Sequence, residues 1–218
     1  MIDTIIRSNS KANLDVQQAA DWWETKMVDD YFTAYSWSLS APHLYQRIPV
    51  NDTMHILELG CGYGRQLSVF CKMSKHVYGL DVSATAISLA REHVPQADVR
   101  VFDGVHVPFA NESMDFVTSV FTMQHVKKST ARQLLKETMR VLKPDCYFLH
   151  EFIGGNWCAG KGKEHYSIAP DNTKIYNNGY TQEELQALCD ALKIQVCWME
   201  EKVMNPDGDT NIWVCGRK

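Results

Sequence analysis

A glycine-rich turn between a predicted strand and a predicted helix most constrains the fold of this sequence. Residues 56–67 read ILELGCGYGRQL, in which an apolar run typical of a buried parallel strand passes into three glycines and then a helical pattern. Gly60 and Gly62 allow backbone conformations that other residues avoid, and they let a ligand approach the backbone closely. The helix that follows would point free N–H groups at that ligand. We therefore expect a ligand-binding turn at the edge of an α/β sheet.

Predicted strands and helices alternate along the rest of the chain. Strand-like apolar runs fall at 54–59, 76–80, 97–102, 114–121, 145–152, 194–200 and 211–216. Helical patterns fall at 65–74, 83–93, 129–142 and 181–192. Ser83 and Ser129 are predicted helix caps, Pro144 is predicted to stop the third helix, and Thr181 with Glu184 has the spacing of a capping box. This rhythm predicts a parallel sheet covered on both faces, with a hairpin at its end.

The spacing of the glycines separates the possible ligands. A dinucleotide fingerprint, G-x-G-x-x-G, that began at Gly60 would need its third glycine where the chain has Arg65. The sequence also lacks the phosphate-binding pattern G-x-x-x-x-G-K-[ST]. What it contains is E-x-G-x-G-x-G, led by Glu58. An oxidoreductase with a nicotinamide cofactor is therefore the weaker alternative.

Two acidic residues end the next two predicted strands. Asp81 lies about twenty residues past the glycine turn, where a carboxylate can accept both hydroxyls of a ribose. Asp103 ends the third strand and could accept from an adenine amino group. Each alone is more often a helix cap or a turn residue. Their joint position at consecutive strand ends, where ligands of open parallel sheets bind, favours a binding site.

These segments resemble the class I methyltransferases that use S-adenosylmethionine, in the branch of small-molecule and quinone enzymes. ILELGCGYGR resembles the first motif of that family, and VYGLDVSATAISLAR resembles the second, whose acid binds ribose. DGVHVPFANESMDFVTSVFTMQHV and RVLKPDCYFLHEF resemble the stretches around the fourth and fifth strands. The likeness runs from about Met54 to the C-terminus. It implies a Rossmann-like, doubly wound seven-stranded α/β sheet of order 3-2-1-4-5-7-6, with strand 7 antiparallel.

The resemblance also implies roles for residues at matching positions. The expected S-adenosylmethionine contacts are Glu58, Gly60, Cys61, Gly62, Arg65, Asp81, Val82, Asp103, Gly104, Val120 and Phe121. Asp81 would bind the ribose, Asp103 would meet the adenine edge, and Phe121 would lie near the sulfonium. Arg65 has two interpretations, a contact to the cofactor carboxylate or a solvated position on a helix face.

The acceptor side offers candidates with weaker signals. His125 follows the fourth strand and is a candidate general base, or else a histidine without a catalytic role. Glu151, His165 and Tyr166 are candidate contacts to the acceptor, whereas His150 should point into the packing. The expected reaction is in-line methyl transfer to oxygen or nitrogen of a small molecule. Alternatives are a macromolecular acceptor and a cofactor-binding subunit without catalysis.

Two segments lie outside the expected sheet. Residues 1–53 look helical and rich in aromatics, and residues 153–180 look like a long polar loop inserted in a domain over 54–218. Both are predicted to close over the cofactor as lids, with packing onto the core as the alternative for the first.

Composition limits the possible partners. The formal net charge is -4 without a basic block, which gives no strong signal for nucleic acid. No apolar run approaches the roughly 20 residues of a membrane span, and the N-terminus does not resemble a signal peptide. We therefore expect a cytoplasmic monomer or homodimer. The seven cysteines lack C-x-x-C spacing, which predicts free buried thiols and no metal site.

Overall fold

The computed structural model describes residue 24 and residues 42–154, 164–168, 174–204 and 208–218. For residues 164–168, 174 and 175 it describes the backbone alone. Most of the predicted N-terminal helical segment therefore lies outside the described residues. Its last part forms the short helix α3 (Pro42–Tyr45), which places Leu44 and Tyr45 in the core.

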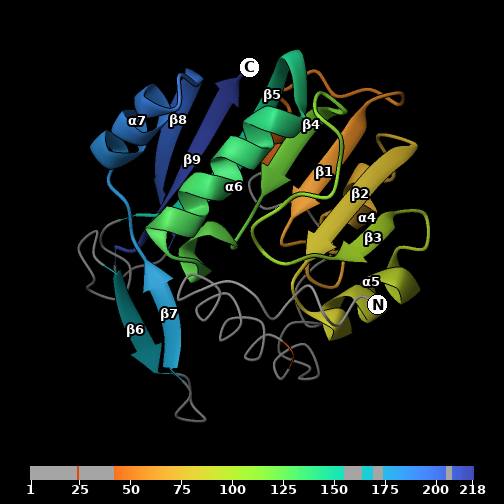
Figure 1. Cartoon of the computed structure of the whole chain (residues 1–218), viewed down its shortest axis with the longest axis horizontal. Coiled ribbons are helices and arrows are strands. Elements are labelled where there is room, and N and C mark those ends of the chain that lie inside the picture. The colour runs from red at the N-terminus through yellow and green to blue at the C-terminus, as the bar shows by residue number, and fades with distance from the viewer. Residues whose placement is uncertain (1–23, 25–41, 155–163, 169–173, 205–207) are drawn as a thin grey trace.

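A single mixed sheet forms the centre of the molecule (Figure 1). Its strands are β1 (His55–Leu59), β2 (His76–Asp81), β3 (Asp98–Val101), β4 (Met114–Ser119), β5 (Leu142–Ile153), β8 (Gln195–Val203) and β9 (Thr210–Arg217). The order is β3-β2-β1-β4-β5-β9-β8, and only β9 runs antiparallel to its two neighbours. With β8 and β9 as the sixth and seventh strands of the sheet, this order confirms the expected topology, including the terminal hairpin.

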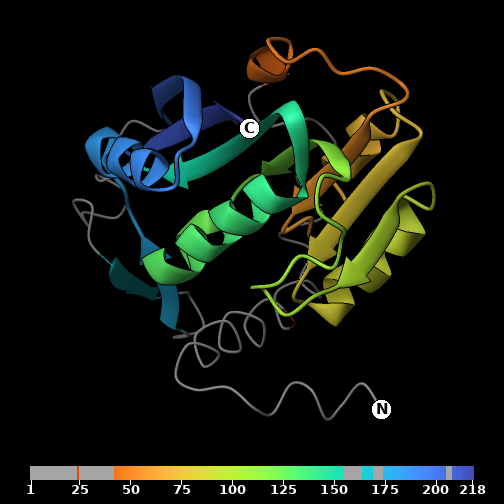
Figure 2. The same cartoon turned by 45° about the horizontal axis from the view of Figure 1, so that its top comes forward.

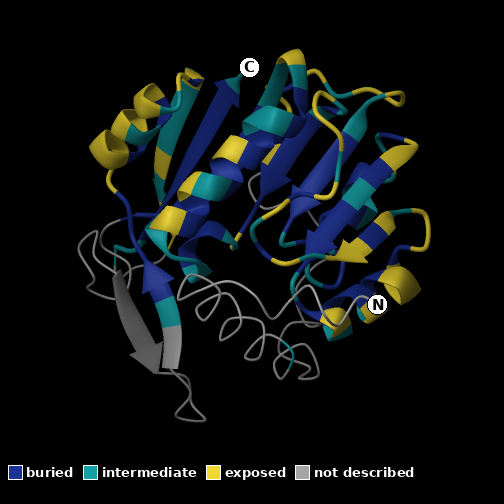
Figure 3. Cartoon of the chain, in the orientation of Figure 1, coloured by how far each residue is buried: buried dark blue, intermediate teal, exposed yellow. Residues whose placement is uncertain are grey.

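Helices cover both faces of this sheet (Figure 2). On one face, α6 (Lys128–Val141) and α7 (Gln182–Ala191) contribute Leu134, Leu135 and Leu185 to one apolar cluster. On the other, α3, α4 (Leu67–Phe70) and α5 (Ala84–His93) belong to a second cluster. Successive residues of β1, Ile56 and Leu57, enter opposite clusters, as the alternation of a strand requires. The central strands are consequently buried, whereas β3 and β8 at the sheet edges carry exposed residues (Figure 3).

The helix ends confirm some predicted caps and correct others. Ser83 accepts from the Ala86 N–H at the start of α5, and Thr181 with Glu184 forms a complete capping box at α7. The prediction that Ser129 caps α6 is wrong, because the helix already begins at Lys128. Pro144 does not stop α6 either. The helix ends at Val141, and Pro144 lies within β5 where the register with β4 shifts, since a bulge can accommodate its missing N–H.

Two other sequence expectations need correction. The predicted helix at 65–74 is regular only over α4, and the rest of it forms turns. The predicted polar loop at 153–180 contains a hairpin of β6 (Glu164–Ile168) and β7 (Lys174–Asn178), which pair antiparallel outside the main sheet. The segments EHYSI and KIYNN contain Tyr and Ile, which favour strands, but the surrounding Gly and Asn residues hid this signal.

Candidate functional site

The glycine turn after β1 is fastened to the neighbouring strand through its backbone. Gly60 and Cys61 both donate their N–H to the Leu80 carbonyl, at 2.7 and 3.0 Å. Gly60 has a φ of 72°, which strains residues that carry a Cβ. A Cβ at this position would also lie 2.6 Å from Thr122 Cγ2, in the turn that follows β4. The turn therefore needs glycine both for its conformation and for the close approach of Thr122.

Asp81, at the end of β2, joins the glycine turn to the start of α5. Its carboxylate accepts hydrogen bonds from the N–H groups of Gly62 at 2.8 Å and Ser83 at 2.9 Å. Burial raises the pKa of Asp81, and these two hydrogen bonds act against that rise. A carboxylate offers about four acceptor positions, so these two bonds leave capacity for ligand hydroxyls. The same side chain can shape the turn and bind a ribose.

Asp103, beyond the end of β3, is hydrogen-bonded within its own turn. Its carboxylate accepts from the N–H groups of Val105 at 2.9 Å and His106 at 2.7 Å, and its Oδ2 lies 2.7 Å from His106 Nδ1. The Asp103 side chain is 49% exposed. Burial acts to raise the pKa of Asp103, but the bonds from His106 and Val105 lower it below its ordinary value. Asp103 thus orders the turn at the position where the adenine edge is expected.

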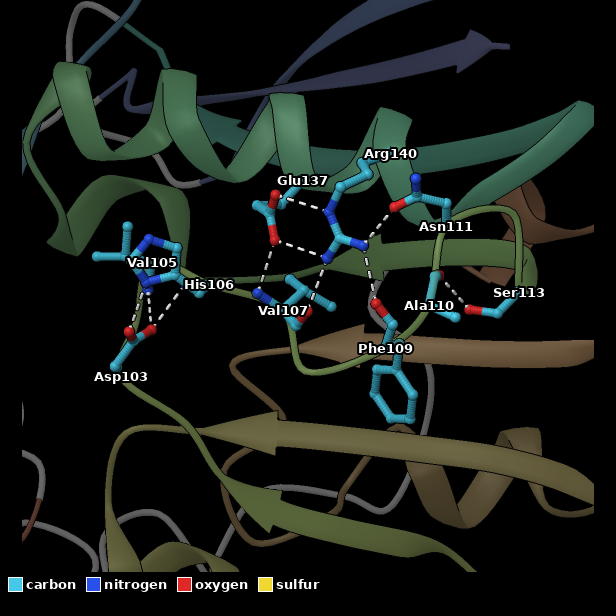
Figure 4. A network of polar contacts seen from close by, with 10 residues as sticks. All are labelled: Asp103, Val105, His106, Val107, Phe109, Ala110, Asn111, Ser113, Glu137 and Arg140. Carbon is cyan, nitrogen blue, oxygen red and sulfur yellow. Dashed lines mark hydrogen bonds and ion pairs between the residues drawn. The ribbon is translucent and has the colours of Figure 1, made fainter. Parts of the chain in front are cut away.

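Arg140 on α6 holds the segment between β3 and β4 in place (Figure 4). Its guanidinium donates to the carbonyls of Val107 at 2.7 Å and Phe109 at 2.8 Å, and to Asn111 Oδ1 at 2.9 Å. It also binds both oxygens of Glu137, whose Oε2 in turn accepts from the Val107 N–H at 2.9 Å. The stretch that follows Asp103 is therefore anchored to a helix on the face of the sheet.

Glu58, the acid that leads the glycine motif, is buried beneath the turn. Its Oε1 accepts from Gln66 Nε2 at 2.8 Å, and Gln66 Oε1 accepts from the Tyr45 hydroxyl at 3.2 Å. Among the described residues, Glu58 Oε2 has no hydrogen-bond partner. Burial raises the pKa of Glu58 to about 8, against the effects of Gln66 and the half-buried Arg65. The sequence did not point to Gln66 or Tyr45, although a buried glutamine beside the glycine turn is a signal for such a network.

The turn after β4 contacts a buried acid near the end of β5. Glu151 on β5 is 1% exposed, and its Oε2 accepts from the Phe121 N–H at 2.9 Å. Its Oε1 accepts from the amide of Asn211 on β9. Burial raises the pKa of Glu151 to about 7. Phe121 itself is 38% exposed, so a large apolar side chain stands at the ligand edge of the sheet.

The remaining expected contacts surround this edge. Cys61, Gly104 and Val120 are buried, whereas Gly60, Gly62 and Val82 are partly exposed. His150 is fully buried between Ser119 Oγ and Thr138 Oγ1, so it points into the packing as expected.

His125 lies in a single turn of 3-10 helix, η1 (Met123–His125), against the β6–β7 hairpin. Its Nδ1 is 3.3 Å from the Tyr176 carbonyl, which assigns the ring proton to Nδ1 because a carbonyl only accepts. Burial lowers the pKa of His125 to about 4, so the imidazole is neutral at pH 7 and only weakly basic. His165 and Tyr166 lie in β6, opposite Asn177 and Tyr176, and their side chains lie outside the described part.

One contact from the N-terminal segment reaches the start of α5, just after β2. Glu24 accepts from the N–H groups of Ala84 and Thr85, the latter at 3.1 Å, at the start of α5. A carboxylate there is stabilised by the free N–H groups and the dipole of the helix. No pattern in the sequence points to this contact, because sixty residues separate its partners.

Within the described residues, no group of three or more His, Cys, Asp or Glu could hold a metal ion. None of the helices described here has the length and apolar character needed to cross a bilayer. Six cysteines are described, all as free thiols, and Cys197 is exposed rather than buried as expected.

Comparison with protein families identifies the central segment. Residues 57–150 match a family described as a methyltransferase domain. The match begins in β1, spans the glycine turn, Asp81 and Asp103, and ends in β5.

Curated relatives share this segment at moderate identity. Methyltransferase GfsG of Streptomyces halstedii is 29% identical over 108 residues, which cover 46% of this chain and 38% of the relative. The tRNA N(3)-cytidine methyltransferase METTL2 of Gallus gallus is 28% identical over 66% of this chain and 44% of its own length. A ubiquinone biosynthesis O-methyltransferase of Rhodopseudomonas palustris is 26% identical over 72% of this chain and 65% of its own length. The chain spans less than two thirds of the length of these relatives.

Solved structures share the fold over a larger part of the chain. A SAM-dependent methyltransferase from Methanosarcina mazei matches with a TM-score of 0.71 at 22% identity, over 82% of this chain and 98% of its own. The 1,6-didemethyltoxoflavin-N1-methyltransferase of Burkholderia thailandensis, with bound S-adenosylhomocysteine, matches with a TM-score of 0.72 at 16% identity, over 97% and 92% of the two chains. The family match and the sheet order thus agree, since residues 57–150 match a methyltransferase domain and the strands have the order that the family resemblance implied.

Proposed function

We propose that this chain is an enzyme that transfers a methyl group from S-adenosylmethionine to oxygen or nitrogen of a small molecule. The observation that carries the proposal is the fastening of the glycine turn to Asp81. That arrangement places backbone N–H groups, a buried carboxylate and the start of a helix at one sheet edge. Within a methyltransferase domain, this edge is where the cofactor is expected to bind.

The residues at this edge fit the chemical groups of S-adenosylmethionine. Asp81 has acceptor capacity for the ribose hydroxyls, and the unpartnered Oε2 of Glu58 can accept a hydrogen bond beside the methionine part. Gly104 and Val82 would border the adenine, with Asp103 ordering the turn next to them. Cys61, Val120 and Phe121 would line the sulfonium side.

The bound cofactor would supply a methyl group already activated on a sulfonium, which an acceptor nucleophile displaces in line. The chain's own contribution is then mainly to position the acceptor and to exclude water. In the proposal, Glu151, His165 and Tyr166 contact the acceptor, and His125 is the candidate base. Because His125 has a pKa of about 4, it would remove a proton only from an acceptor that is itself acidic, or through a change of environment on binding.

A small-molecule acceptor is supported by the names of two relatives and by the charge of the chain. One is the ubiquinone biosynthesis O-methyltransferase, and the other is the solved structure of a 1,6-didemethyltoxoflavin-N1-methyltransferase with 1,6-didemethyltoxoflavin bound. A net charge of -4 does not favour a polyanionic acceptor. The relative named for tRNA makes RNA the second candidate acceptor.

A two-stage experiment tests the proposal. The first stage compares melting temperatures with S-adenosylhomocysteine and with NADH, where a ligand at a hundredfold excess over Kd stabilises by about 2.7 kcal/mol. A shift with NADH alone would contradict the methyltransferase assignment. The second stage offers radiolabelled S-adenosylmethionine with phenol, amine and quinol panels and with bulk tRNA. Label in tRNA alone would replace the small-molecule proposal, and binding without transfer to either class would favour a non-catalytic subunit.

A further inference from the structure

The turn after β4 adopts a conformation that its own side chain disfavours. Phe121 has a φ of 54°, in the left-handed region that bulky residues rarely occupy. Such strain persists only where the surrounding structure holds it, and it is common at ligand sites. Here the holding group is Glu151, which accepts the Phe121 N–H at 2.9 Å.

The Glu151 carboxyl is fixed from a second side. Asn211, which is fully buried on the antiparallel strand β9, donates its amide to Glu151 Oε1. Residues 152 and 153 of β5 pair with residues 212 and 211 of β9, so the two side chains come from adjoining strands. With one oxygen bound by Asn211 and the other by Phe121, the carboxyl cannot rotate away from the turn without leaving buried donors unpaired.

The strained turn rests directly on the glycine turn. Thr122 follows Phe121, and its hydroxyl donates to the Leu59 carbonyl at 3.2 Å, in the residue just before Gly60. The Thr122 side chain fills the space that a Cβ of Gly60 would occupy. Any change in the backbone at Phe121 therefore displaces a side chain that lies against the turn after β1.

We propose that Glu151 is a positioning residue for cofactor binding. Its carboxyl, held by Asn211, fixes the left-handed turn at Phe121, and this turn seats Thr122 on Gly60 and sets the shape of the glycine turn. The inference rests on the proposed cofactor site. It gives Glu151 a role that is separate from any contact with the acceptor, and it adds Asn211 and Thr122 to the residues on which the site depends.

The affinity for S-adenosylhomocysteine, measured by calorimetry, tests this role without knowledge of the acceptor. Glu151→Met fills a similar volume but removes the acceptor oxygens, and it should weaken binding by about tenfold, the effect of one charged hydrogen bond. Glu151→Gln retains an oxygen for the Phe121 N–H, while the Asn211 amide can turn over to accept from the new NH₂ group. Glu151→Gln should therefore bind measurably more tightly than Glu151→Met.

Substitutions at the exposed residue 121 provide a test that does not depend on the folding of a Glu151 variant. Glycine adopts a φ of 54° freely, whereas a β-branched valine opposes it. Phe121→Val should bind S-adenosylhomocysteine more weakly than Phe121→Gly, although both lose the aromatic ring. In the Phe121→Gly background, Glu151→Met should cause a smaller further loss than it does alone, because the conformation no longer needs to be held.

Each result decides between the proposal and its alternatives. Equal affinity of the unmodified chain and a folded Glu151→Met variant would overturn the positioning role. So would equal losses in Glu151→Met and Glu151→Gln, equal affinities of Phe121→Val and Phe121→Gly, or an undiminished loss in the Phe121→Gly background. If the unmodified chain binds no S-adenosylhomocysteine, the proposed function itself fails, and the positioning role fails with it.

Discussion

The two halves of the ligand edge hold their acidic side chains by different kinds of contact. At the end of β2 and just beyond β3, Asp81 binds the N–H of Ser83, and Asp103 binds those of Val105 and His106, all within three residues. The longer contact of Asp81, nineteen residues back to the Gly62 N–H, lies within the same glycine motif. At the ends of β4 and β5, the contacts come from far along the chain. Glu151 binds the Phe121 N–H thirty residues away and Asn211 sixty residues away.

This difference explains why the half formed by the ends of β2 and β3 carries a readable motif, whereas the half formed by the ends of β4 and β5 does not. Local contacts impose a short, ordered pattern of residues, such as an acid followed by a helix cap. Long-range contacts require only that two complementary side chains lie close together in the fold, so they set no particular spacing in the sequence.

Removal of the central acid of the local half should have the largest effect. Asp81→Ala loses its bonds to the Gly62 and Ser83 N–H groups together with the proposed ribose contact. We expect S-adenosylhomocysteine binding to weaken by about 1.5–3 kcal/mol, the value of a charged hydrogen bond, in a protein that still folds. Calorimetry gives the affinity, and Asp98→Ala, an exposed acid at the start of β3, is the matched control. Unchanged affinity for S-adenosylhomocysteine in a folded Asp81→Ala variant would show that Asp81 only stabilises the start of the helix and does not bind the cofactor.

The two buried glutamates, Glu58 and Glu151, should lower the free energy of unfolding over different ranges of pH. Burial raises the pKa of Glu58 to about 8 and that of Glu151 to about 7, from an ordinary value of 4.5. Because a raised pKa means that the folded protein favours the protonated glutamate, the contribution of each glutamate to the free energy of unfolding is complete below pH 4.5. This contribution is lost as the pH rises from 4.5 to the pKa in the folded protein. Between pH 7 and 8, Glu58 should cost about 1 kcal/mol of unfolding free energy, and Glu151 about a third of that.

Urea unfolding of the ligand-free protein at pH 7 and pH 8 measures this cost. Glu58→Gln keeps the bond from Gln66 and should remove most of the loss over this interval, whereas Glu151→Gln should retain most of it. The same slope in all three proteins would show that neither Glu58 nor Glu151 titrates in this range.

The contact from the N-terminal segment should have the smallest effect. Glu24→Gln weakens the binding of the Ala84 and Thr85 N–H groups at the helix terminus, commonly worth about 0.3–1 kcal/mol. If residues 1–53 close over the cofactor, S-adenosylhomocysteine affinity should fall two- to fivefold, in proportion to that energy. Hydrogen exchange at the start of α5 should rise as well. Glu92→Gln, exposed at the other end of α5, is the control, and equal effects of the two would argue against a lid anchored by Glu24.

Most of the main sheet could be predicted from the sequence, because its strands and helices obey local rules. Apolar runs located all seven strands, and the order followed from the family resemblance together with the β-α-β rhythm. The predictions were wrong where the tertiary structure overrode a local sequence preference. Ser129 looked like a cap but α6 begins one residue earlier, and Pro144 was accommodated by a bulge rather than ending the helix. The β6–β7 hairpin was missed because its polar surroundings resemble a loop.

The sequence by itself determined the glycine turn, the acids at the ends of β2 and β3, and the sheet that displays them. These features depend on backbone conformation and on short-range hydrogen bonds, which residue type and spacing specify directly. Only the tertiary structure decided that Asp103 is engaged by His106, that Gln66 and Tyr45 reach Glu58, and that Glu151 holds the Phe121 turn. Those arrangements depend on which side chains burial forces together and leaves in need of a partner. Burial depends on the packing of the whole chain, which the spacing of residues in a motif does not specify.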